Sequence, residues 1–236
     1  MRIEVWSDVV CPWCYIGKRR LETALEAFPH RDEVEVVYRS FELDPSALQH
    51  GHERTLTTLA RKYGRGEDEM RSMMQNVVET AAEEGLAFRL FDNVHTRTVD
   101  AHRLLHLALD TGGAALQREL KEALLAAYFV RAENVGDHDV LRAEAVGVGL
   151  DAARVDEVLA GADYTDEVEA DIAQARAYGA TGVPFFVVDQ RYGLSGAQPA
   201  EVFGQLLEQA WAESHPGLEV VGAPGAEACG PDGCAI

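Results

Sequence analysis

The first part of the chain changes from one hydrophobic period to another near Cys11. Residues 2–7 alternate between the two faces of an extended chain, with Ile3 and Val5 on one face, which predicts a strand that ends before Cys11. From Cys14 onward the apolar residues recur every three or four positions, as is typical of an amphipathic helix. This apolar stripe consists of Cys14, Gly17, Leu21, Ala24, Leu25 and Phe28. We therefore expect Cys11 at the start of a helix and Cys14 on its buried side.

Helical periodicity dominates the middle of the chain. Residues 34–43 first predict a second strand. Helical segments then follow at residues 55–64, 67–85, 99–113, 115–129, 137–149, 151–161 and 164–179. Asp137 and Asp151 are candidate N-caps, because their side chains can accept a hydrogen bond from the first turn of a helix. We expect the methionines of segment 67–85 to pack in the core.

Two short strands and a last helix complete the pattern. Residues 184–188 are apolar on both faces, as expected of a central strand, and residues 191–195 are its expected hairpin partner. A helix ending near Trp211 follows, and residues 214–236 are rich in Gly and Pro, which predicts a flexible tail. Strands at the two ends of the chain need each other to bury their apolar faces. The sequence therefore predicts an α/β fold with one mixed sheet and a helical insertion.

Composition and charge narrow the classes of function. The chain has 236 residues and a formal net charge of −19. This acidic field disfavours nucleic acid as a partner, because phosphate binding requires clustered Lys and Arg. No stretch is long and apolar enough to span a bilayer, and the acids within residues 2–10 disfavour a signal peptide. We expect a cytoplasmic protein without a membrane partner, in a compartment where thiols are kept reduced.

The sequence C-P-W-C at residues 11–14 carries the candidate chemistry. A Cys11 thiolate at a helix start would face unpaired N–H groups and the positive end of the helix dipole, so we expect the pKa of Cys11 to lie below its free value of about 8.5. Cys14 faces inward and is expected to remain a thiol. Pro12 suits the first turn of a helix, and Trp13 is expected to cover the pair with apolar surface. This arrangement predicts Cys11 as nucleophile and Cys14 as resolving thiol in disulfide exchange.

A structural zinc site is the alternative interpretation of the cysteines. The chain has four of them, and the second pair, Cys229 and Cys234, would complete a set of four thiolates. However, Cys14 points into the apolar stripe of its own helix, and the second pair does not form a compact knuckle. We therefore expect a redox pair and no metal.

Several motifs resemble one known family. C-P-W-C-Y-x-G at a helix start, with T-G-V-P-F-F-V-V at residues 181–188, resembles the DsbA-like branch of the thioredoxin superfamily. The sequences D-A-H-R-L-L-H-L-A, A-Y-F and S-G-A-Q-P narrow the resemblance to the FrnE-like group. It covers nearly the whole chain up to Trp211. It implies a thioredoxin fold with a large inserted α-helical domain.

The resemblance also implies a domain organisation. Residues 1–45 and 165–213 would form the thioredoxin-like domain, residues 46–164 the helical insertion, and residues 214–236 the flexible tail. The implied partners are disulfide-containing proteins or small thiols. Glutathione is a candidate co-substrate, and no bound cofactor is expected.

The resemblance further implies which residues shape the site. The proline of the G-V-P motif is cis in the family and lies against the cysteine pair, which carries over to Pro184, with Val183 before it. The backbone of Val183 would then pair with an extended substrate peptide. Many such enzymes bury a carboxylate beneath the resolving cysteine, but Val5 stands at the corresponding position here. Asp8 is expected to be a solvated residue at the strand end.

His102 and Arg103 leave two interpretations open. His102 shares an apolar helical stripe with Leu105 and Leu109, which favours a core residue with its hydrogen bonds satisfied; otherwise His102 and Arg103 line the cleft between insertion and sheet. The related kappa-class transferases and hydroxychromene-carboxylate isomerases use that cleft for glutathione, so a glutathione-dependent isomerase is the alternative function. Those enzymes generally have serine in place of Cys11, which favours redox chemistry here. A non-enzymatic, chaperone-like binding protein is the third hypothesis.

The tail carries the second cysteine pair. Cys229 and Cys234 flank Gly-Pro-Asp-Gly, which favours a tight turn that brings the two sulfur atoms together. Tethering raises the effective concentration of this pair near the first one. We expect Cys229 and Cys234 to act as an auxiliary redox pair that exchanges electrons with Cys11 and Cys14, or covers the site when substrate is absent.

Overall fold

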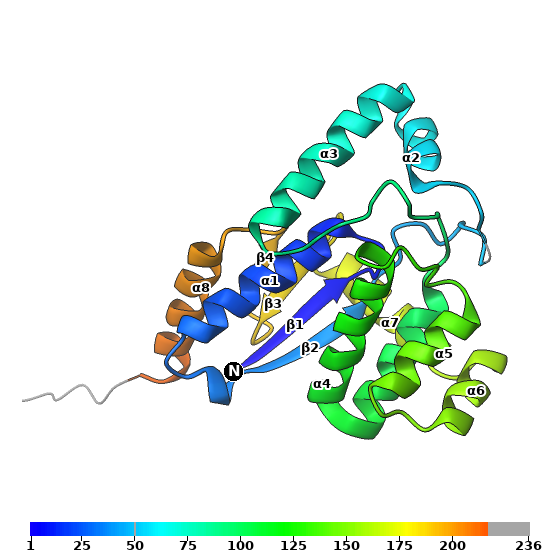
Figure 1. Ribbon diagram of the computed structural model, residues 1–236. Coiled ribbons are helices and arrows are strands. Elements are labelled where there is room, and N and C mark those ends of the chain that lie inside the picture. The colour runs from blue at the N-terminus through cyan, green and yellow to red at the C-terminus, as the bar shows by residue number, and fades with distance from the viewer. Residues whose placement is uncertain (50, 217–236) are drawn as a thin grey trace, which may run out of the picture.

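Strands from both ends of the chain form one mixed sheet. The structure is a computed structural model that describes residues 1–49 and 51–216. Within these residues the sheet consists of β1 (Arg2–Ser7), β2 (Glu35–Ser40), β3 (Phe185–Val188) and β4 (Tyr192–Ser195). The order is β2-β1-β3-β4, with β1 parallel to β2 and antiparallel to β3, and with β3 antiparallel to β4 (Figure 1). The predicted mixed sheet and the predicted hairpin are confirmed.

The helices follow the predicted segments closely. They are α1 (Pro12–Ala27), the 3₁₀ turn η1 (Arg31–Glu33), α2 (Thr55–Tyr63), α3 (Glu67–Glu83), α4 (Val99–Phe129), α5 (His138–Gly147), α6 (Ala152–Ala160), α7 (Thr165–Ala177) and α8 (Ala200–Ser214). Asp137 and Asp151 accept hydrogen bonds from the backbone N–H groups of the first turns of α5 and α6, as predicted. α4 consists of the two helical segments predicted at 99–113 and 115–129, separated by a kink at Gly113, whose φ of 69° and ψ of −169° are not helical.

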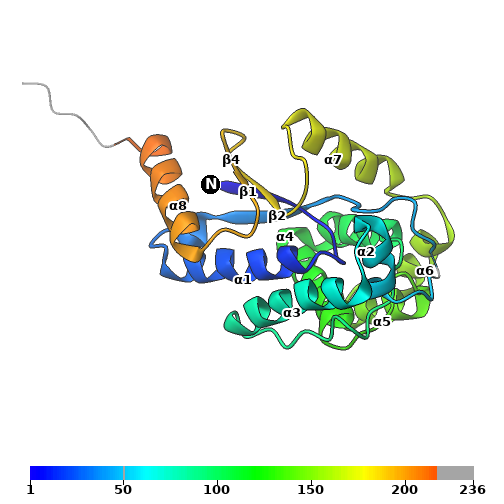
Figure 2. The same ribbon diagram turned by 90° about the horizontal axis from the view of Figure 1, so that it is seen from above.

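The sheet lies between two layers of helices. α1 and α8 pack on one face, against a core that includes Ile3, Val5 and Phe186. α7 packs on the other face, against Trp6 and Val187. Figure 2 shows α1 and α7 on opposite sides of the sheet. The alternation read from residues 2–7 therefore assigns the two faces of β1 correctly.

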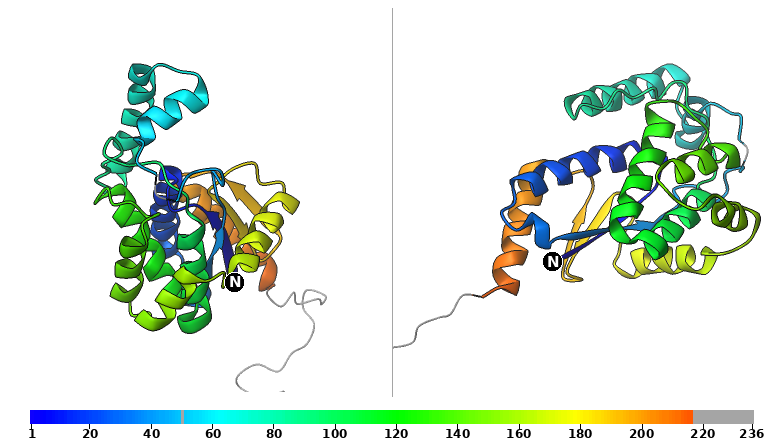
Figure 3. Two further views of the ribbon diagram at one scale, coloured as in Figure 1. Left: turned by 90° about the vertical axis from the view of Figure 1, so that its right-hand side faces the viewer. Right: turned by 60° about the horizontal axis from the view of Figure 1, so that its bottom comes forward.

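The segment between β2 and β3 forms a second hydrophobic core. Leu104, Leu120 and Val155 are fully buried within it, and Tyr15 and Ile16 from the first turns of α1 belong to the same cluster. The α2–α3 pair and the α5–α6 pair occupy different ends of this helical insertion (Figure 3). Within the described residues no helix has the length and apolar character needed to cross a membrane. The predicted fold class, a sheet with a large helical insertion, is confirmed.

A glutamine side chain closes one edge of the sheet. β2 is an edge strand, and Gln117 of α4 is completely buried beside it. The Tyr38 N–H donates to Gln117 Oε1 (2.8 Å), and Gln117 Nε2 donates to the Tyr38 carbonyl (2.9 Å). The side-chain amide thus replaces the backbone of a further strand and satisfies two groups that would otherwise be buried without partners. This contact fixes α4 against the sheet.

Replacing Gln117 by Leu tests this contact. Two buried backbone groups of Tyr38 lose their partners, each worth about 1–3 kcal/mol, so we expect the free energy of unfolding to fall by about 2–6 kcal/mol. Chemical denaturation followed by circular dichroism measures the change. Gln75→Leu on the exposed side of α3 is the matched control and should change stability much less. Equal stability of the Gln117→Leu variant and the wild type would contradict this role.

Candidate active site

Cys11 and Cys14 lie where β1 passes into α1. Cys11 is the N-cap residue of α1, with φ −93° and ψ 113°, and Pro12 is the first helical residue, as predicted. The Cys14 N–H donates to the Cys11 carbonyl (3.0 Å), so the two residues share the first turn. Neither thiol forms a disulfide with another cysteine among the described residues, and each residue is only 3% exposed. The motif therefore places two reduced sulfurs at one buried helix start.

The cis proline loop contacts this pair. The Val183-Pro184 bond is cis, and Cys11 Sγ donates to the Val183 carbonyl (3.5 Å). The predicted cis bond beside the cysteines is confirmed. A Cβ at Gly17 would lie 3.2 Å from Pro184 Cγ, so the glycine in the motif allows the loop to approach α1 closely.

A pocket of about 580 Å³ opens beside Cys11. It lies between the start of α1, the loop at Gly182 and Val183, and helices α2 and α3 of the insertion. Its mainly apolar wall includes Val10, Pro12, Trp13, Leu43, Leu59, Tyr63, Met70, Met73, Met74 and Val77. Cys11 contributes to the wall and Cys14 does not.

The pocket changes the interpretation of two sequence features. The methionines of α3 were expected in the core, and Met70 and Met74 are indeed buried, but together with Met73, which is 44% exposed, they form one wall of the pocket. The periodicity of α3 identifies its apolar face but cannot show that this face borders an open space. Trp13 is 41% exposed and lies at the pocket next to Cys11.

The expectation for Asp8 was wrong. This residue is completely buried, because the turn after β1 folds it under the insertion. Its carboxylate accepts a hydrogen bond from the Leu43 N–H (2.8 Å) and lies 3.4 Å from His102 Nε2. Burial raises the pKa of Asp8, but the hydrogen bond and charge of His102 outweigh it, so the pKa lies below its ordinary value.

Lys121 was not among the predicted site residues, and it is completely buried in α4. Its Nζ donates to the Ser7 carbonyl (3.4 Å) and lies 5.6 Å from the centre of the Tyr38 ring. Burial lowers the pKa of Lys121 to about 8, and the negative charge of Cys14 opposes this shift. The sequence pattern that could have indicated its burial is its position between Leu120 and Leu124, on the buried stripe of segment 115–129.

The order of thiol ionisation differs from the expected one. The hydrogen bond with Cys14 raises the pKa of Cys11 well above its ordinary value, and burial raises it further. Burial also raises the pKa of Cys14, but the hydrogen bond from Cys11 and the positive charge of Lys121 bring it below its ordinary value. The expectation failed because the Cys11 side chain makes no capping hydrogen bond with the helix and instead contacts Val183 and Cys14. These opposite shifts favour the thiolate at Cys14, the sulfur behind Cys11.

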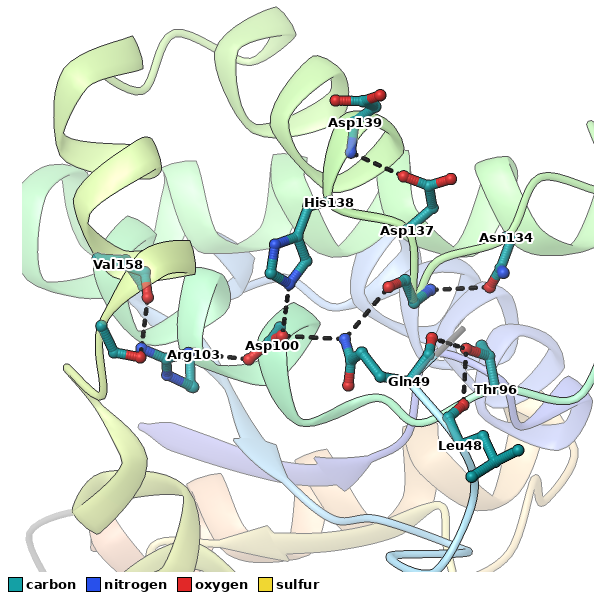
Figure 4. A network of polar contacts seen from close by, with 12 residues as sticks. Leu48, Gln49, Thr96, Asp100, Arg103, Asn134, Asp137, His138, Asp139 and Val158 are labelled. Carbon is teal, nitrogen blue, oxygen red and sulfur yellow. Dashed lines mark hydrogen bonds and ion pairs between the residues drawn. The ribbon is translucent and has the colours of Figure 1, made fainter. Parts of the chain in front are cut away.

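Neither His102 nor Arg103 lines the pocket, which agrees with the interpretation of His102 as a core residue and gives no support to the cleft interpretation. His102 is buried against Asp8, with its Nδ1 atom unpartnered. The Arg103 guanidinium points the other way, toward Asp100 and the carbonyl of Val158 (Figure 4). It also donates to the Gly161 carbonyl (2.8 Å). Arg103 therefore holds the end of α6 against α4, which is a structural role.

The remaining predicted site residues have no structural test. Within residues 1–49 and 51–216, no group of three or more His, Cys, Asp or Glu side chains is arranged to hold a metal ion. Cys229 and Cys234 lie outside the described residues, so the auxiliary pair stays a prediction.

Comparison with known proteins agrees with this geometry. The family model described as a DSBA-like thioredoxin domain matches residues 2–208. The chain belongs to this family. Its fold is therefore a thioredoxin-like fold with a helical insertion. A crystal structure of a probable DsbA oxidoreductase from Streptomyces coelicolor is 52% identical, with a TM-score of 0.85, and the match covers 100% of this chain and 99% of that one.

More distant structures share the fold only. A 2-hydroxychromene-2-carboxylate isomerase is 12% identical with a TM-score of 0.64, and covers 91% of this chain and 98% of its own. The cytosolic disulfide reductase DsbM from Pseudomonas aeruginosa, solved with GSH, is 16% identical with a TM-score of 0.59, and covers 89% and 99%. The same architecture is thus found in proteins named as a reductase and as an isomerase.

The pocket geometry predicts which cysteine reacts first with an external reagent. Cys11 forms part of the wall and Cys14 does not, so we expect a bulky maleimide to modify Cys11 first. Peptide mapping by mass spectrometry after short labelling measures the order, in a Cys229→Ser, Cys234→Ser background that removes the other thiols. Faster labelling of Cys14 would contradict the assignment of Cys11 as the accessible sulfur.

Proposed function

We propose that this protein is a thiol–disulfide oxidoreductase in which Cys11 is the nucleophile and Cys14 the resolving thiol. The observation that carries the proposal is the placement of Cys11 Sγ at the wall of the pocket, 3.5 Å from the Val183 carbonyl, with Cys14 behind it. A substrate disulfide entering the pocket meets Cys11 first. The family assignment supports a thiol oxidoreductase, and the pocket adds the direction of approach.

The exchange proceeds in two steps. Cys11 gives up its proton to the Cys14 thiolate and attacks one sulfur of the substrate, which forms a mixed disulfide and releases the other sulfur as a thiolate. Cys14 then loses its proton and attacks Cys11 Sγ, which releases the second substrate sulfur. The pair is oxidised to a disulfide, and the substrate is reduced by two electrons to two thiols. Run in reverse, the same steps oxidise a dithiol.

The character of the pocket favours a polypeptide substrate whose disulfide is flanked by apolar side chains. Three methionines and Tyr63 offer an adaptable apolar surface, and the Val183 backbone beside Cys11 offers a pairing site for an extended strand. Glutathione is the proposed small-thiol partner that regenerates the pair. We place this work in the cytoplasm, as reduction or isomerisation of disulfides. The proteins named DsbM and 2-hydroxychromene-2-carboxylate isomerase make glutathione-dependent reduction and isomerisation the two activities to compare.

The roles of the two cysteines are tested by single substitutions. Cys11→Ser should abolish turnover of a disulfide substrate, because the attacking sulfur is gone, whereas Cys14→Ser should accumulate a mixed disulfide that cannot resolve. Non-reducing gel electrophoresis and mass spectrometry detect the trapped species, in a Cys229→Ser, Cys234→Ser background. Retained disulfide turnover by Cys11→Ser would overturn the proposal. Binding of unfolded chains that persists in this variant would support the chaperone-like hypothesis, and isomerase activity with glutathione would support the alternative enzyme.

The substrate class is tested at the rim of the pocket. Met73→Glu places a charge on the apolar wall, so we expect kcat/KM for a peptide disulfide with apolar flanks to fall roughly tenfold, while turnover of glutathione disulfide stays nearly unchanged. Leu48→Glu is the matched control, because Leu48 is 75% exposed and lies outside the pocket wall. An equal loss for both substrates in Met73→Glu would argue against a polypeptide occupying this wall.

A further inference from the structure

Lys121 is a buried cation without a carboxylate partner. It is fully buried, and among the described residues no Asp or Glu side chain lies within ion-pair distance of its Nζ. Lys18, the other buried lysine near the site, differs in this respect, because its Nζ lies 2.6 Å from both Glu22 and Glu122. A buried ammonium group without a counter-ion is strongly destabilising. The anion that balances Lys121 must therefore come from somewhere else.

The groups that face Lys121 identify this anion. They come from α1, from the turn before it and from β2, and they are Cys11, Cys14, Lys18, Asp8 and Tyr38. Asp8 is already engaged by His102 and the Leu43 N–H. Tyr38 offers a neutral ring face, and Lys18 repels. Cys14 exerts the largest favourable charge effect on Lys121, and the charge of Lys121 in turn lowers the pKa of Cys14.

We propose that Lys121 is the positioning residue that supplies the counter-charge for the Cys14 thiolate and receives its proton during resolution. This inference rests on the proposed redox function of the pair. The hydroxyl of Ser7 supports it, because it is buried, has no hydrogen-bond partner within the described residues, and lowers the pKa of Cys14 as a potential donor. Ser7 also provides the carbonyl that holds the Lys121 ammonium. One strand end thus holds a donor for the thiolate and an acceptor for the cation.

Lys121 exchanges a proton with Cys14 during the resolving step. When substrate is bound to Cys11, Cys14 is a thiol, and Lys121 has lost its counter-charge and releases a proton to water. The neutral Lys121 amine then accepts the proton of Cys14, the Cys14 thiolate attacks Cys11 Sγ, and the bond between Cys11 and the substrate sulfur breaks. The substrate leaves as a thiolate and takes up a proton from water. Two electrons pass from the cysteine pair to the substrate, as in the proposed reaction.

The test replaces Lys121 by methionine, an uncharged side chain of similar length. In a full-length Cys229→Ser, Cys234→Ser background, Lys121→Met should raise the pKa of the first thiol ionisation by about one unit, which means roughly tenfold less thiolate at neutral pH. The ultraviolet absorbance of the thiolate as a function of pH measures this without any substrate. The difference from the parent should narrow above pH 8, where Lys121 itself loses its charge. At a fixed glutathione ratio, the variant should also contain more disulfide, because its reduced form has lost a stabilising charge.

Three further variants separate the effect of charge from the effect of packing. Lys18→Met removes a buried lysine that has its own carboxylates, and should leave the thiolate titration almost unchanged. Lys121→Arg keeps the charge and should keep the low thiol pKa, and Lys121→Gln replaces Lys121→Met if the latter does not fold, as judged by chemical denaturation. A folded Lys121→Met or Lys121→Gln variant with the titration of the parent would overturn the inference. Because the titration needs no turnover, its result is independent of whether the proposed enzymatic activity is found.

Discussion

The site depends on the way α1 bridges two hydrophobic cores. Its first turns, with Tyr15 and Ile16, belong to the core of the insertion, and its later part, with Leu21 and Ala24, belongs to the core on the sheet. A rigid helix shared by two cores holds Cys11 and Cys14 at their junction. The pocket forms at the same junction, because α3 of the insertion lies across the side of α1 that carries Cys11.

Polar contacts strengthen this junction on the side away from the pocket. Glu122 of α4 accepts a hydrogen bond from Tyr15 Oη (2.5 Å) and pairs with Lys18 and Arg19 of α1. Burial raises the pKa of Glu122, but the hydrogen bonds and charges of Arg19 and Lys18 outweigh it and lower the pKa to about 2. This carboxylate therefore stays charged throughout the neutral and mildly acidic range. The insertion is therefore tied to α1 by charged contacts as well as by apolar ones.

Local patterns predicted most of the fold and the identity of the cysteine pair. The alternation in β1, the change of period at Cys14 and the caps at Asp137 and Asp151 are all determined by neighbours in sequence, and the structure agrees with them. The expectations that failed concern contacts between distant segments. Whether Asp8 is solvated depends on the position of residue 43, and the lowered pKa of Cys14 arises from the hydrogen bond of Cys11 and from the charge of Lys121, more than a hundred residues away. Periodicity showed that these side chains lie on buried faces but not which partners they meet there.

The position of Glu4 in β1 explains why the charged group proposed to act on Cys11 and Cys14 is a lysine and not a carboxylate. Val5 faces α1 and the sheet core, while the neighbouring Glu4 points to the opposite face and pairs with Arg39 (2.5 Å). Glu4 cannot reach Cys14 from there, and Asp8, the next carboxylate along the chain, is engaged by His102. The space beneath the resolving thiol is instead approached from α4, whose position against β2 is set by Gln117. Lys121 follows one helical turn later, on the same buried stripe, so the residue that closes the sheet edge also directs the buried charge toward the cysteines.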